Sequence, residues 1–143
     1  MVDERDLAIL DELKRDGRAS VRTLAKRLGM RPSTVHQRMK RLKDDGVIRK
    51  YTIAVDHAQL GEELVVFMLV SGTSSKYLDR RLLGNPYVHE VFGVTGEYDV
   101  MLKLRFPGIQ EFNEFVIDFR DTYSDAVAKT VTMIGTIDLK EGG

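Results

Sequence analysis

Apolar residues in the first 46 positions recur at helical spacing in three short segments. In the first segment, 3–16, the leucines fall on one stripe of a predicted helix: Leu7, Leu10 and Leu13. A second helix is predicted from Ser20, a favourable N-cap, to Gly29, a favourable C-terminal residue. Its inward residues are Val21, Leu24, Ala25 and Leu28.

A third helix begins near Pro32, which suits a first helical turn, and closes at the segment 44–46. Its buried stripe is Val35, Met39 and Leu42. Arg31 is a poor N-cap, so a start capped by Ser33 is the alternative. Three helices with a tight turn before the last predict a helix-turn-helix unit.

The segment 47–55 is rich in strand-forming residues and contains Arg49, Lys50 and Tyr51. It is predicted to be a small wing or a connecting strand. The residues 56–61 then form a capped single turn that ends in glycine. We therefore expect two domains, 1–60 and 61–143.

The second domain alternates strand and helix patterns. The predicted elements are strand 64–71, helix 75–83, strands 88–95 and 98–106, helix 109–123 and strand 126–139. This βαββαβ order predicts a ferredoxin-like sandwich, so the whole chain belongs to the α+β class. Gly96 and Glu97 occupy the centre of a predicted two-residue type II′ hairpin.

The first strand of that domain is apolar at both alternating positions, as in a strand buried on both faces. Two helices can cover only one face of a four-stranded sheet. We expect the same sheet of a second copy to cover the other face, which predicts a two-fold homodimer. The alternative is an uncovered apolar patch, which would favour aggregation.

Composition excludes several classes of protein. The chain has 143 residues, of which 43% are hydrophobic and 31% charged, as expected for a folded protein. Without cysteine it has neither disulfides nor thiolate metal ligands. The longest uncharged stretch, 64–75, is short for a membrane span, and the acidic start is unlike a signal peptide, so a cytoplasmic location without membrane contact is expected.

Charge is unevenly distributed, although Lys plus Arg and Asp plus Glu both number 22. Residues 1–60 hold 14 basic and 9 acidic side chains, whereas residues 61–143 hold 8 and 13. Within 20–50 the numbers are 10 and 2, enough positive charge to bind a polyanion. A solvated basic face is the alternative.

The third predicted helix presents hydrogen-bond donors opposite its buried stripe. Such side chains pair with base edges and phosphates, and a recognition helix presents them from its N-terminal half. A polar surface helix in an ordinary bundle is the alternative. The candidate contacts to double-stranded DNA are Arg22, Arg31, Ser33, Thr34, His36, Gln37, Arg38, Lys40, Arg41 and Lys50.

The order and spacing of these motifs resemble the Lrp/AsnC family of bacterial and archaeal regulators. The matching residues are Asp3 to Leu13, Asp16-Gly17-Arg18, Leu24-Ala25, Gly29 to Arg38, Leu42, Gly46-Val47-Ile48 and Gly96-Glu97-Tyr98-Asp99. The resemblance implies a winged helix-turn-helix, a hinge strand and an amino-acid-sensing RAM domain. It further implies dimers that commonly assemble into octamers on pseudo-palindromic operators.

The resemblance also implies an effector site near the tip 95–99, between dimers. Asp99 or Glu97 is a candidate acceptor for an ammonium group, while the Gly96 amide and threonine hydroxyls are candidate donors to a carboxylate. Turn formation and plain β-propensity are the alternative roles. The candidate effector residues are Thr95, Gly96, Glu97, Tyr98, Asp99, Thr130 and Thr132.

Two other functions are alternatives to an effector-gated regulator. Siroheme decarboxylases resemble this architecture, but His36, His57 and His89 lack metal-ligand spacing and no Gly-rich phosphate loop is present. We therefore predict no catalytic residue, no metal site and no cofactor beyond an amino-acid effector. An architectural DNA-binding protein that senses nothing remains the second alternative.

Overall fold

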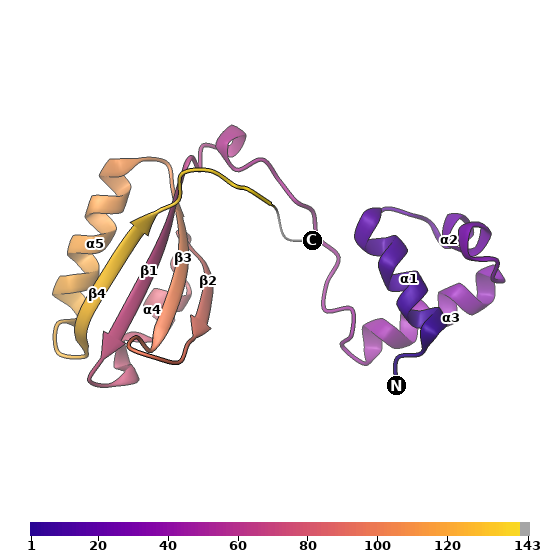
Figure 1. Ribbon diagram of the computed structural model, residues 1–143, viewed down its shortest axis with the longest axis horizontal. Coiled ribbons are helices and arrows are strands. Elements are labelled where there is room, and N and C mark those ends of the chain that lie inside the picture. The colour runs from indigo at the N-terminus through magenta and orange to yellow at the C-terminus, as the bar shows by residue number, and fades with distance from the viewer. Residues whose placement is uncertain (141–143) are drawn as a thin grey trace. The chain divides into compact units, whose positions relative to one another are not determined.

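The computed structural model describes residues 1–140, and its chain divides into two compact units. The division falls between Val55 and Asp56, close to the predicted boundary near residue 60 (Figure 1). The last three residues of the predicted domain 61–143 lie outside the described residues. Each unit has its own hydrophobic core and is described separately.

The first unit consists of three helices, α1 (Glu4–Arg15), α2 (Val21–Leu28) and α3 (Pro32–Asp44). Asp3 and Asp6 form a reciprocal capping box at the start of α1, and Ser20 caps α2 by accepting from the Thr23 amide. Gly29 ends α2 in the left-handed conformation, with φ of 64°. These features confirm the predicted helix-turn-helix unit.

The buried face of α1 differs from the predicted leucine stripe. Ile9 is fully buried with Leu24, Ala25 and Val35, whereas Leu7 is 52% exposed. A spacing of three residues drifts around a helix, so Leu7, Leu10 and Leu13 do not all face the core. The second buried position of α1 is a carboxylate, Asp6.

The start of α3 and the segment after it correct two further expectations. Helix α3 begins at Pro32 with Arg31 as an N-cap that makes no side-chain hydrogen bond, so the alternative start at Ser33 is wrong. The predicted strand 47–55 is also wrong, because this segment pairs with no other strand among residues 1–140. An isolated strand leaves its backbone groups unpaired and is not stable alone.

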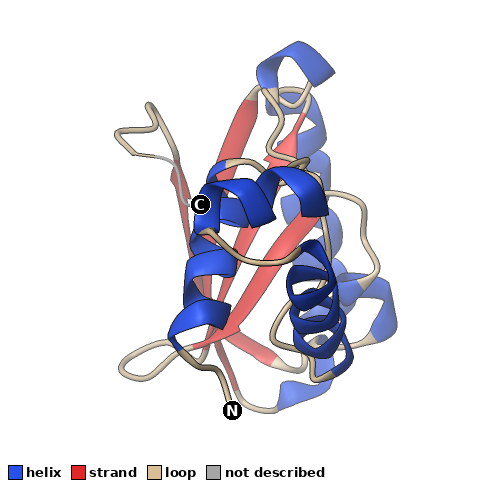
Figure 2. Ribbon diagram, turned by 90° about the vertical axis from the view of Figure 1, so that its right-hand side faces the viewer, coloured by secondary structure: helices blue, strands red, loops and turns tan. Residues whose placement is uncertain are grey.

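The second unit begins with a 3₁₀ turn, η1 (Ala58–Leu60), closed by Gly61 as predicted. Its sheet contains β1 (Leu64–Gly72), β2 (Val88–Gly93), β3 (Val100–Phe106) and β4 (Val127–Ile134). The strands, red in Figure 2, are antiparallel in the order β2-β3-β1-β4, which confirms the ferredoxin-like topology. Helix α5 (Ile109–Tyr123) has the bounds that its apolar spacing predicted.

The predicted helix 75–83 is split into η2 (Ser75–Tyr77) and α4 (Arg80–Leu83). Asp79 interrupts it, since its carboxylate accepts from the Leu82 amide and so starts a new helix. The predicted strand 126–139 stops at Ile134, because Val66 is the last residue of β1 that it pairs with. Between Gly135 and Lys140, only the Gly135 amide donates a backbone hydrogen bond to β1, at the Val65 carbonyl.

The connection between β2 and β3 is longer than the predicted two-residue hairpin. It spans residues 94–99, with Gly96 at a positive φ of 112° and one closing hydrogen bond from the Val94 amide to the Asp99 carbonyl. The Asp99 amide donates instead to Val70 of β1. This bond draws residue 99 toward the neighbouring strand and ends the β2–β3 pairing early.

The two faces of the sheet are unequal. Alternate residues of β1 and β3 on one face, including Met68 and Leu102, are buried beneath Phe119 of α5. The opposite face carries apolar side chains that remain accessible in one chain: Phe92 at 49%, Val131 at 39% and Met133 at 46%.

None of the helices in residues 1–140 combines the length and the apolar composition that a membrane-spanning helix requires.

Candidate nucleic-acid interface and effector site

A buried ionic network fixes α3 against α1. The fully buried Asp6 accepts hydrogen bonds from Arg38 Nη1 at 2.9 Å and from Arg41 Nη2 at 2.7 Å. Arg38 Nη1 also lies 2.7 Å from Asp3 Oδ2 and, with the Asp6 amide, lowers the pKa of Asp3 to about 2. Because both arginines extend from successive turns of α3, the network orients this helix on the unit.

The network gives two predicted DNA contacts a structural role. Arg38 is mostly buried between α1 and α3, while Arg41 keeps about half of its side chain accessible. Lys40 pairs with Asp44 at 2.8 Å, which raises the pKa of Lys40. DNA contact by any of the three stays a prediction, and for Arg38 it would compete with the ion pairs to Asp3 and Asp6.

The remaining candidate contacts divide by exposure. Thr34 is half-buried. The others are exposed, and none of them forms a salt bridge within residues 1–140: Arg22, Arg31, Ser33, His36, Gln37 and Lys50. Ser33, His36 and Gln37 share the N-terminal half of α3. These three side chains are therefore available to base edges.

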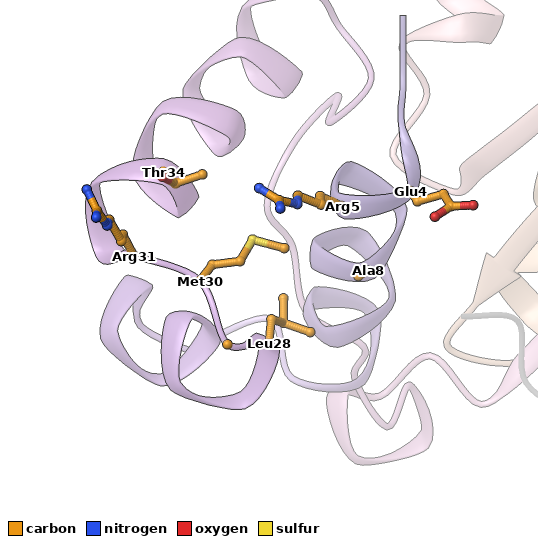
Figure 3. A pocket seen from close by; sticks show the side chains of 8 residues that line it. Glu4, Arg5, Ala8, Leu28, Met30, Arg31 and Thr34 are labelled. Carbon is orange, nitrogen blue, oxygen red and sulfur yellow. The ribbon is translucent and has the colours of Figure 1, made fainter.

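A cleft of about 550 Å³ lies in the first unit beside the α2–α3 turn. Figure 3 shows Arg5 of α1 and Thr34 of α3 pointing toward each other across it, above Met30, while Arg31 points away. None of the predicted effector residues lines this cleft. Arg5 and Arg31 bring positive charge to this cleft, and Glu4 brings one negative charge.

The predicted effector residues 95–99 lie at one end of the sheet, beside the start of β4. Asp99 Oδ2 accepts from the Gly72 amide at 2.9 Å, and this is the only side-chain hydrogen bond of Asp99 in the described part of the chain. Glu97 forms an ion pair with Lys129, which lowers the pKa of Glu97 and raises that of Lys129. Each carboxylate thus has one partner among the described residues, but only that of Glu97 is a cation, so the charge of Asp99 is not neutralised by an ion pair there.

The structure adds one residue to this group that sequence reasoning missed. Besides pairing with Glu97, Lys129 places its ammonium nitrogen 5.0 Å from the ring centre of Tyr98. The antiparallel register of β4 on β1 places Lys129 opposite Ser71, and no local sequence pattern specifies that register. Thr130 follows opposite Val70, whereas Thr132 lies further along β4, opposite Met68.

Sequence spacing also missed a cluster in the second unit. His57 and His89 are separated by 32 positions in the chain, but both lie close to Glu62. Because a linear motif search considers nearby positions, it separates side chains that the fold brings together. His36 belongs to the first unit and takes no part in this cluster.

Comparison with known proteins agrees with both units. A family model described as winged helix-turn-helix DNA-binding matches residues 2–49. Another, described as Lrp/AsnC ligand binding domain, matches residues 65–142. The fold and these matches define a DNA-binding transcriptional regulator with a ligand-binding domain.

Individual relatives indicate which family of transcriptional regulators the chain belongs to. An uncharacterized HTH-type transcriptional regulator of Pyrococcus furiosus is 35% identical over 99% of this chain and 97% of its own length. Escherichia coli AsnC superposes with a TM-score of 0.88 at 27% identity, covering 100% of this chain and 97% of AsnC. A Neisseria meningitidis transcriptional regulator solved as a complex with L-Met gives 0.87 at 26%, over 99% and 94%. The chain belongs to the Lrp/AsnC family.

Proposed function

We propose that the protein is a sequence-specific transcriptional regulator that reads its operator with α3 and responds to an amino acid. The observation that carries this proposal is the exposed set Ser33, His36 and Gln37 on a helix anchored by Asp6. An anchored helix loses little conformational entropy when it enters the major groove. No catalytic step is part of the proposed function.

A second copy of the chain supplies the other half of the reading surface. The sheet face carrying Phe92, Val131 and Met133 is apolar and accessible in one chain, so its burial against the same face of a second copy favours a dimer. Two α3 helices would then contact half-sites about 34–36 Å apart, or a multiple of that distance. Further association of dimers, up to an octamer, is included in the proposal.

The effector is proposed to be a free amino acid bound near the 94–99 connection. The Asp99 carboxylate has one oxygen without a protein partner among the described residues, which suits an ammonium group. The L-Met complex of the Neisseria regulator supports an amino acid as the class of ligand. The pairing of Glu97 with Lys129 makes Glu97 a weaker candidate for the same role.

Fluorescence anisotropy tests the DNA-binding part of the proposal. A duplex from the region upstream of the protein's own gene is compared with a scrambled duplex of equal composition, at two salt concentrations. We expect preference for the native duplex by about a thousandfold or more and a steep dependence on salt. Equal, weak binding to both duplexes would instead indicate an architectural protein.

The variant Asp99→Asn tests the effector part. Asparagine retains an oxygen that accepts from the Gly72 amide but removes the negative charge, so the connection keeps its anchor while ammonium binding weakens. We expect the shift in DNA affinity caused by pooled amino acids, typically worth about 1–3 kcal/mol, to be lost. Binding of effector-free protein to the native duplex should be unchanged. An undiminished response would place the effector elsewhere.

A further inference from the structure

Two histidines and a glutamate converge at one edge of the second unit. His57 Nδ1 lies 2.6 Å from Glu62 Oε2, and His89 Nε2 lies 4.0 Å from the same oxygen. One potential ligand atom from each residue lies within 4.8 Å of the other two. The imidazole rings are 5.8 Å apart between centres and meet edge to face.

Two irregular backbone features place these side chains together. His57 directly precedes the 3₁₀ turn η1, and the Glu62 amide donates to the His57 carbonyl at 2.9 Å, so the turn brings both residues to one side. His89 lies on the edge strand β2 where the register shifts between Val88 and Glu90. A bulge re-aims a side chain that a regular strand would place by alternation.

The donor set matches the preferences of borderline transition metals. Two imidazoles and one carboxylate are a common ligand set for Zn²⁺, Co²⁺ and related divalent ions. In tetrahedral coordination, metal bonds of about 2.0–2.1 Å place ligand atoms about 3.3 Å apart. The two distances from Glu62 Oε2, 2.6 and 4.0 Å, lie on either side of that value, so modest side-chain rotations would suffice.

The local charge is compatible with a cation, although not uniformly favourable. The hydrogen bond with His57 holds the pKa of Glu62 below its ordinary range, so the carboxylate is ionised at neutral pH. The side chains of His57, Glu62 and His89 are each about one-third accessible or less, which leaves room for a water ligand. Arg105 also acts on Glu62 through its charge and would oppose a cation.

We propose that His57, Glu62 and His89 form a binding site for a divalent transition-metal cation of the Zn²⁺ class. The site lies wholly within the second unit and shares no residue with the candidate DNA contacts or the candidate effector residues. Bound metal would tie the turn 57–62 to the edge strand β2. It would thereby fix the first residues of the second unit, which follow the Val55 boundary.

Metal titration of the untagged full-length protein tests this site. Zn²⁺ is titrated calorimetrically in a non-coordinating buffer, and Co²⁺ serves as a second probe through its visible absorption. We expect one equivalent per chain. The variants His57→Asn, Glu62→Gln and His89→Asn should each weaken binding by about tenfold or more.

Matched controls separate the site from adventitious surface binding. His36→Asn removes the remaining histidine, and Glu63→Gln removes the carboxylate next to Glu62, so both should retain full metal affinity. Binding that is equal in all five variants, or less than half an equivalent in the wild type, would overturn the proposal.

A measurement on the wild type covers the case in which a ligand variant fails to fold. Paramagnetic Co²⁺ broadens the NMR signals of nearby rings, so the imidazole signals of His57 and His89 should disappear at one equivalent while that of His36 persists. Broadening of His36 together with the others, or of none, would contradict a site at these residues.

Discussion

Asp6 shows how a single residue can serve a fold without contributing apolar area. A carboxylate buried in a small helical unit is costly unless charged hydrogen bonds satisfy it, and here two arginines from α3 and the Asp3 amide do so. The same arginines were predicted to contact DNA from their charge and position alone. Because both arginines pair with Asp6, their charge and position alone do not establish them as DNA contacts.

Stability should respond to acid through Asp3. The pKa of this carboxyl is lowered from 3.8 to about 2 in the folded protein, mainly by the hydrogen bond from Arg38. The resulting stabilisation is present above the ordinary pKa and lost as the pH falls toward the folded value. Asp3→Asn should therefore unfold at lower urea concentration than wild type at about pH 6, but nearly equally at about pH 2.

Urea unfolding followed by far-UV circular dichroism measures this difference. Asparagine is also a good N-cap, so the helix start is kept in the variant. Asp11→Asn, an exposed position on the same helix, is the control and should show no such pH-dependent gap. A gap that persists undiminished at low pH would exclude the ion pair as its cause.

Gln37 and Lys50 should affect DNA binding differently. Gln37 is exposed in the N-terminal half of α3, which is proposed to contact base edges. Gln37→Ala should therefore lose about 1–3 kcal/mol of binding free energy on the native duplex, with little change on a scrambled one. Lys50 follows α3, and its proposed contact is with phosphate, which is the same in every sequence. Lys50→Ala should therefore weaken binding to both duplexes and lower the salt slope by about 1. Anisotropy titrations measure both, and equal losses for Gln37→Ala on the two duplexes would refute base contact.

At the scale of elements, α3 is the one helix of the first unit whose N-cap residue makes no side-chain hydrogen bond. Asp3 and Ser20 cap α1 and α2 with side-chain hydrogen bonds, whereas Arg31 makes none at α3. A cap would satisfy one of the free amides of the first turn. That the chain keeps an arginine here is consistent with a phosphate contact, which Arg31 is free to make from its outward position in Figure 3.

Arg31→Ser should therefore stabilise the first unit while weakening DNA binding. The gain expected from a serine cap is about 0.5–2 kcal/mol, measured as an upward shift in the urea midpoint. Arg31→Ala removes the same charge without providing a cap and should give the loss of DNA affinity without the gain. Equal stability of the two variants would show that the cap position is not limiting.

At the scale of the whole molecule, the accessible apolar face of the sheet is the reason to expect a homodimer. Met133 on β4 and Ile117 on α5 are both exposed in one chain, at 46% and 60%, but only Met133 lies on the apolar sheet face. Met133→Glu should prevent the proposed dimer by placing a charge in its buried interface, while Ile117→Glu should leave that dimer intact. Light scattering after size-exclusion chromatography distinguishes the two, and a monomeric wild type would contradict the proposed interface.

Local sequence determined most of the elements and the order in which they occur. Caps at Ser20 and Gly29 and the apolar spacing of 109–123 act between residues a few positions apart, so their effects can be read from the chain. The alternation of strand and helix patterns likewise predicted the βαββαβ topology. The excess of basic residues in 20–50 likewise indicated a nucleic-acid partner, because charge within a short segment can be counted without knowing the fold.

Tertiary structure alone decided which side chains meet. Residues 47–55 have strand-like composition but no partner strand in the described part of the chain. The predicted two-residue hairpin at Gly96 is instead a longer connection, because Asp99 bonds to β1. Asp6 with Arg38, Glu97 with Lys129, and His57 with His89 come together from positions at least 32 apart. Such pairs depend on strand register and helix packing, which the pattern of one short segment does not contain.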